Sequence, residues 1–130
     1  MSTLKADTIQ STGGGAATLT KQTAAKTFSV FEPDVAATTA SLNISGITDN
    51  GAGDFSHAFT SAFGAAKQYT FAGSCGNTSN STGAIEYCKP REEPDMLASS
   101  VRTLTGYVAP SGATVYDYPN SSFAIHGDLA

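Results

Sequence analysis

Residues 41–60, SLNISGITDNGAGDFSHAFT, hold two alternating stretches with a turn between them. Large apolar or ring-bearing side chains stand at every second position on both sides of that turn: Leu42, Ile44, Phe55, His57 and Phe59. A period of two is typical of β-strands, whose alternate side chains point to one face. Residues 49–53, DNGAG, are rich in turn-forming residues. This stretch therefore predicts a hairpin that turns near residues 49–53, with the five alternating side chains packed together at the centre of the core.

The same alternation recurs along most of the chain after residue 26. Further candidate strands are KTFSVF at 26–31, QYTFAG at 68–73, AIEYCK at 84–89, VRTLTGYVA at 101–109, ATVYDY at 113–118 and SFAIH at 122–126. Residues 74–83 are polar and residues 89–100 contain two prolines, so both segments are expected to be loops. About seven or eight short strands with regular turns predict a mainly β protein, an antiparallel β-sandwich over residues 27–130.

Residues 1–26 have a different character and are expected to form an extended N-terminal arm with a short helix. Residues 1–17 contain only Leu4 and Ile9 as larger apolar side chains beyond the first methionine, so they must lie along the domain or along another subunit. Residues 18–26, TLTKQTAAK, favour a short helix that packing has to stabilise. The core of the sandwich is small, and oligomerisation would stabilise it further.

Charge and composition exclude several classes of function. The net charge is −4 and the isoelectric point is about 4.8, so we expect no binding of nucleic acid through its phosphates. No apolar stretch approaches the roughly 20 residues that a membrane-spanning helix needs, and no signal peptide is evident, so synthesis in a cytoplasm is expected. Cys75 and Cys88 could pair across neighbouring strands, but a reducing cytoplasm favours free thiols.

The candidate catalytic and metal-binding residues do not have the spacing that a catalytic or metal site requires. The sequence DFSH brings Asp54, Ser56 and His57 together, yet Ser56 and His57 would point to opposite faces of a strand and could not share a proton. We therefore expect His57 to be structural. Three acidic residues of one loop lack the alternating ligands and turning glycine of a calcium site: Glu92, Glu93 and Asp95. We expect no enzymatic activity, no metal and no cofactor.

Three segments resemble a known group of proteins. Residues 4–26, LKADTIQSTGGGAATLTKQTAAK, look like the N-terminal region of small virion proteins of tailed bacteriophages, which are described as tail-fibre or tail-fibre-like. The hairpin SGITDNGAGDF at 45–55 and the ending HGDLA at 126–130 are similar to the same group. The resemblance covers both ends and the middle of the chain, whereas residues 74–120 are the least familiar part.

The resemblance implies a role and a location. It implies a structural virion protein, part of a tail fibre or appendage that attaches the particle to the bacterial host surface, and a homotrimer. The arm would then dock on a neighbouring virion protein or a sister subunit through five residues: Leu4, Ile9, Gly13, Gly14 and Gly15. Three tyrosines of the later strands and loops are candidates for stacking on a surface glycan: Tyr107, Tyr116 and Tyr118. The alternatives are a capsid or tail decoration protein without receptor binding and, from another class, a glycan depolymerase, for which the domain has little room.

Overall fold

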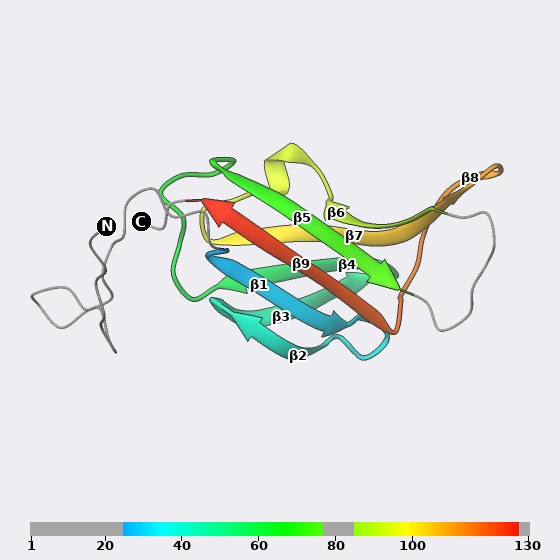
Figure 1. Cartoon of the computed structure of the whole chain (residues 1–130), viewed down its shortest axis with the longest axis horizontal. Coiled ribbons are helices and arrows are strands. Elements are labelled where there is room, and N and C mark those ends of the chain that lie inside the picture. Colours follow the sequence, from blue (N-terminus) through cyan, green and yellow to red (C-terminus); the bar gives the residue numbers. More distant parts are fainter. Residues whose placement is uncertain (1–24, 77–84, 128–130) are drawn as a thin grey trace, which may run out of the picture.

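The computed structural model describes residues 25–76 and 85–127, which form two antiparallel β-sheets packed face to face (Figure 1). The four-stranded sheet contains, in spatial order, β2 (Ala37–Leu42), β1 (Thr27–Glu32), β9 (Asn120–Gly127) and β5 (Tyr69–Gly76). The five-stranded sheet contains β3 (Ile44–Gly51), β4 (Asp54–Phe59), β7 (Ser100–Ala109) and β6 (Ile85–Pro90), with β8 (Gly112–Val115) also paired to β7. The predicted antiparallel β-sandwich is confirmed. Within the described residues it has nine strands and two single-turn 3-10 helices, Pro33–Val35 and Glu93–Asp95.

Alternate residues of the strands point between the two sheets and form the core. The buried apolar side chains are Phe31, Phe55, Phe59, Phe63, Tyr69, Cys88, Val101, Tyr118, Phe123 and Ile125. The predicted inward face of β4 is confirmed, because Phe55, His57 and Phe59 are all buried. Aromatic rings meet edge to face, with the centroids of Phe31 and Phe55 5.6 Å apart and those of Phe59 and Phe63 5.2 Å apart. The Phe31–Phe55 contact joins the two sheets, and Phe63 packs on this core from the β4–β5 connection.

His57 lies within this core and is fully buried. Its ring centroid is 4.7 Å from those of both Phe31 and Phe123. Its Nε2 lies 3.2 Å from the Thr103 hydroxyl, and its Nδ1 has no hydrogen-bond partner in the described part of the chain. Burial lowers the pKa of His57 to about 3, so the imidazole is neutral near pH 7. The position of His57 among aromatic rings supports the structural role expected for it.

The junction between β2 and β3 differs from the prediction. Asn43 adopts a left-handed backbone conformation with φ of 59°, and the chain passes there from one sheet to the other. The Asn43 side chain donates to the Thr27 hydroxyl at 3.0 Å and accepts from the Ser61 N–H at 2.6 Å. The expectation that Leu42 and Ile44 share one strand face is therefore wrong. Leu42 is 47% exposed on the outside, whereas Ile44 packs against the core.

Some boundaries also differ from the predicted ones. Residues 74–76, expected in a loop, continue β5, and Ala25 and Lys26 at the end of the expected helix are not helical. β2 begins at Ala37, whereas the next strand after residues 26–31 was expected to begin near residue 41. The arm at 1–17, the rest of the expected helix at 18–24 and residues 77–84 lie outside the described residues.

The two cysteines are free thiols at neighbouring edges of the two sheets. Cys75 on β5 donates through Sγ to the Tyr87 carbonyl on β6 at 3.0 Å. Burial raises the pKa of the Cys75 thiol, and it raises that of Cys88 to about 12. Both side chains therefore remain protonated near pH 7, as expected of thiols that take part in packing.

Successive strands run in opposite directions, which gives the sandwich two distinct ends. The terminal end holds the start of β1 at Thr27 and the end of β9 at Gly127. The distal end holds the connections at residues 33–36, 52–53, 110–111 and 116–119. Figure 1 shows β8 projecting at the distal end. The connections at the distal end are therefore separated from the start of β1 by the length of the sheets.

Candidate functional site at the distal end

The three tyrosines predicted as recognition residues lie together at the distal end. Tyr107 belongs to β7, whereas Tyr116 and Tyr118 belong to the connection from β8 to β9. The ring centroids of Tyr107 and Tyr116 are 6.5 Å apart and those of Tyr116 and Tyr118 are 5.2 Å apart, both edge to face. The three rings form one aromatic group, here called the tyrosine cluster.

The members of the tyrosine cluster differ in exposure. Tyr116 is 50% exposed and Tyr107 is half-buried, whereas only 2% of Tyr118 is exposed. Burial raises the pKa of Tyr118 to about 12, and the Glu86 carboxylate adds to this shift. A side chain as buried as Tyr118 supports the other rings and cannot itself be the main contact for a ligand. Tyr116 is the ring that a partner can reach most readily.

Hydrogen bonds hold residues 116–119 against two other parts of the sheet. The Tyr116 N–H donates to the Thr105 carbonyl at 3.0 Å, and the Thr105 hydroxyl donates to the Tyr116 carbonyl at 2.8 Å. The Gly53 N–H donates to the Asp117 carboxylate at 2.6 Å, and the Thr105 N–H donates to the Gly53 carbonyl at 2.8 Å. The tyrosine cluster is thus fixed to the strands before any ligand binds, which lowers the entropy cost of binding.

Gly53 is the position at which this arrangement allows no side chain. Its φ is +66°, in the left-handed region that favours glycine. A Cβ there would lie 2.6 Å from the Tyr116 nitrogen and closer still to the Thr105 carbonyl oxygen. The sequence identifies Gly53 only as a turn former. Its contact with the β8–β9 connection was missed because no local pattern links these distant segments.

The strands beside the tyrosine cluster carry exposed aliphatic side chains. All four residues of β8 are exposed, and its first residue, Gly112, has φ of +125° directly after the turn at residues 110–111. On the outer face, Ile85 of β6 pairs with Val108 of β7, and these side chains are 73% and 43% exposed. Val115 at the end of β8 is 42% exposed. The distal end therefore offers aromatic and aliphatic contact surface on elements of the sheet itself.

The described connections at the distal end carry acidic side chains and no lysine or arginine. Asp34 lies in the β1–β2 connection and Asp117 in the β8–β9 connection. Glu86 on β6 lies close enough to Tyr118 to raise its pKa. The described connections of the distal end therefore carry a net negative charge, which disfavours a polyanionic partner there.

The other candidate residues do not form a second site. Ser56 accepts a hydrogen bond from the Asn50 amide at 2.9 Å, and His57 points to the opposite face, as predicted. In the acidic loop, Asp95 accepts a hydrogen bond from Arg91 at 3.2 Å, and Glu92 is exposed. The predicted docking residues lie outside the described residues: Leu4, Ile9, Gly13, Gly14 and Gly15.

Across residues 25–76 and 85–127, no three His, Cys, Asp or Glu side chains come close enough to hold a metal ion. In the same ranges, no helix has the length and apolar character that crossing a membrane requires. Compared with models of protein families, with curated proteins and with solved structures, the chain gives no match.

Proposed function

We propose that this protein is a structural component of a tailed-bacteriophage virion, in a tail fibre or related appendage, and attaches the particle to a glycan on the bacterial surface. The observation that carries the proposal is the placement of the tyrosine cluster. Tyr116 lies half-exposed at the distal end, whereas the chain enters the sandwich at Thr27 on the terminal end. An adhesin needs its recognition surface and its anchor at opposite ends. The resemblance of the N-terminal segment and the hairpin to phage virion proteins supports the same role.

The tyrosine cluster suits a sugar ligand. A tyrosine side chain combines a large apolar ring surface with a polar hydroxyl at its tip. Ligand-binding sites combine such rings with a few polar groups. Tyr116 supplies the exposed ring, with the half-buried ring of Tyr107 beside it. The net negative charge of the distal connections favours a neutral or positively charged glycan over a polyanionic one.

The remaining parts of the proposal concern assembly. Residues 1–26 act as a docking arm that holds the sandwich to a neighbouring virion protein, and the assembled unit is a homotrimer. The protein is made in the host cytoplasm and resides in the virion. It has no enzymatic activity, needs no cofactor, and does not bind nucleic acid or enter a membrane.

The attachment role is tested with purified full-length protein. Wild type, Tyr116→Ala and Leu97→Ala are titrated with purified bacterial surface polysaccharides and with whole cells. Leu97 is 48% exposed in the β6–β7 connection at the terminal end, so its variant is a control for loss of exposed apolar area. The chain contains no tryptophan, and three of its five tyrosines form the cluster, so tyrosine fluorescence reports binding directly.

The expected result is that the wild type and Leu97→Ala bind while Tyr116→Ala binds at least about tenfold more weakly. Equal binding by all three proteins would refute a role for the tyrosine cluster. Gold labelling of the chain on intact particles tests the location. Label at the tail supports the proposal, whereas a lattice of label over the head would replace it with a decoration protein.

A further inference from the structure

The outer face of the five-stranded sheet is charged. Arg102 on β7 donates two hydrogen bonds to the Asp54 carboxylate on β4, at 2.7 and 2.8 Å. Arg91 lies 3.6 Å from the same carboxylate and 3.2 Å from that of Asp95. A network of partly exposed ion pairs is typical of a face in contact with water.

The outer face of the four-stranded sheet differs in its charge. Between Glu32 near its distal end and His126 near its terminal end, the outward side chains of its strands are all uncharged. They are Phe28, Val30, Ala40, Leu42, Thr70, Ala72, Ser74, Ser122 and Ala124. This surface is here called the uncharged face. The sandwich thus has one outer face suited to water and one that lacks charge almost completely.

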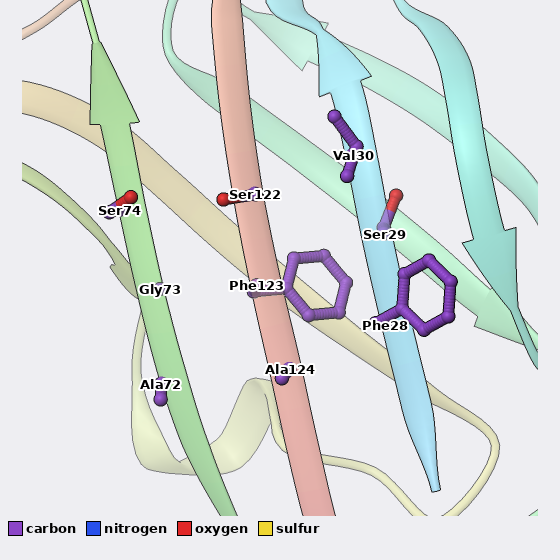
Figure 2. Close-up of a pocket in the computed structure, with 9 residues that line it drawn as sticks. All are labelled: Phe28, Ser29, Val30, Ala72, Gly73, Ser74, Ser122, Phe123 and Ala124. Atoms are coloured by element: carbon purple, nitrogen blue, oxygen red, sulfur yellow. The ribbon is translucent and has the colours of Figure 1, made fainter. Parts of the chain in front are cut away.

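A shallow groove of about 440 Å³ lies on the uncharged face. Figure 2 shows its lining on three neighbouring strands, β1, β9 and β5. Phe28 and Val30 on β1 are its large outward side chains, Phe123 on β9 belongs to the core, and the other outward residues are small: Ala72, Ser74, Ser122 and Ala124. The groove contains no ionisable side chain that could select a charged ligand.

The edge strand β2 continues the uncharged face. All six of its residues, Ala37–Leu42, are exposed, which means that neither of its faces is covered. Its sequence, ATTASL, contains no charge and no proline, the usual protection of an exposed edge strand. Leu42 is 47% exposed beside its β1 neighbour Phe28. An uncharged edge strand without this protection, beside the exposed Leu42, indicates a surface that is covered in the assembled protein.

We propose that the uncharged face, from β2 to β5, is the surface through which copies of this chain pack against one another. Each copy carries a net charge of −4, so contact through most other surfaces brings like charges together. The uncharged face avoids that repulsion, and it offers no charge to attract a partner of opposite sign. This inference does not depend on what the tyrosine cluster binds.

The size of the face agrees with such an interface. Four strands at about 4.8 Å spacing and six to eight residues long cover roughly 20 Å by 25 Å. Each copy thus contributes roughly 500 Å², and three copies with this face turned towards a common axis bury about 1,500 Å² in all. The exposed edge of β2 can add to this area.

The test compares two alanines that are matched in exposure and orientation. Ala72 lies on the uncharged face in β5, and Ala58 lies on the outer face of the other sheet in β4; both are exposed. Full-length wild type, Ala72→Arg, Ala58→Arg and the uncharged variant Ala72→Ser are studied by sedimentation velocity over a range of micromolar concentrations. Circular dichroism and thermal melting establish that each variant is folded.

We expect wild type, Ala58→Arg and Ala72→Ser to form the same oligomer. Ala72→Arg should be a folded monomer, or should dissociate at a concentration at least about a hundredfold higher, because it would bury an unpaired charge between copies. Unchanged association of Ala72→Arg would overturn the proposal. A monomeric wild type whose melting temperature falls with Ala72→Arg alone would also overturn it, and would assign the uncharged face to the N-terminal segment of the same chain.

Discussion

Gly53 donates its backbone N–H to the Asp117 carboxylate at 2.6 Å, although 64 positions separate the two residues. The bond joins the β3–β4 turn to the segment that carries Tyr116. The turn of the central hairpin therefore sets the position of the tyrosine cluster. The sequence at residues 49–53 thus determines the placement of Tyr116 as well as the turn of the hairpin.

Gly53→Ala should lower the stability of the sandwich by about 1–3 kcal/mol. The added Cβ would meet the Tyr116 nitrogen and the Thr105 carbonyl, and residue 53 would keep a positive φ. Urea unfolding followed by tyrosine fluorescence measures the change. Gly46→Ala is the control, because a Cβ at Gly46 has nothing within 4 Å. Equal stability of the two variants would contradict the close approach described at Gly53.

Acid should weaken the fold through His57. The pKa of His57 falls from 6.5 to about 3 on folding, so the unfolded chain takes up the proton first as the pH drops. The stability due to the neutral imidazole is complete above pH 6.5 and is lost progressively towards pH 3, by up to roughly 1.4 kcal/mol per pH unit.

Urea unfolding of wild type and His57→Leu across that pH window measures this effect. The variant has no titrating group at this position, so its stability should fall less steeply with acid. Identical slopes for the two proteins would mean that His57 is not buried as a neutral ring.

Phe59→Ala should destabilise the sandwich by roughly 3–5 kcal/mol, the usual cost of truncating a core phenylalanine. Phe59 is 8% exposed and its ring packs against Phe63 and Tyr69. Glu92→Ala in the exposed acidic loop should leave the melting temperature almost unchanged. Calorimetry of both variants makes the comparison, and a small effect at Phe59 would contradict its place in the core.

Deletion of residues 2–17 should leave a folded β-sandwich that no longer enters particles. The inward faces of the two sheets cover one another from Thr27 onward, so the arm is not needed to complete the core. Circular dichroism and thermal melting test the fold, and complementation of particles that lack the protein tests incorporation. An unfolded product would place the arm within the fold, and normal incorporation would exclude it as the dock.

The inward-facing residues could be predicted best in strands that have one buried face. The period of two at Phe55, His57 and Phe59 identified the inward face of β4, because such strands alternate between core and solvent. The same rule failed at Asn43, where SLNIS alternates perfectly and yet contains a change of sheet. A single left-handed residue leaves the hydropathy pattern intact while it redirects the backbone.

The tyrosine cluster was only partly predictable. Tyr107, Tyr116 and Tyr118 could be named as candidates, but their assembly depends on the β7–β8 hairpin and on bonds to Gly53. Those contacts link segments far apart in the chain, and one sequence carries no local signal for them. The difference in exposure between Tyr116 and Tyr118 arises from the same long-range packing.

The place of β1 between β2 and β9 has a mechanical consequence. If the arm that precedes Thr27 anchors the protein while the distal end holds a surface, tension acts along the axis of β1. Its hydrogen bonds to both neighbours run across that axis, so the load is shared as shear by all of them at once. A strand at the edge of the sheet would have partners on one side only. The strand that bears the tension is therefore hydrogen-bonded to a neighbouring strand on each side.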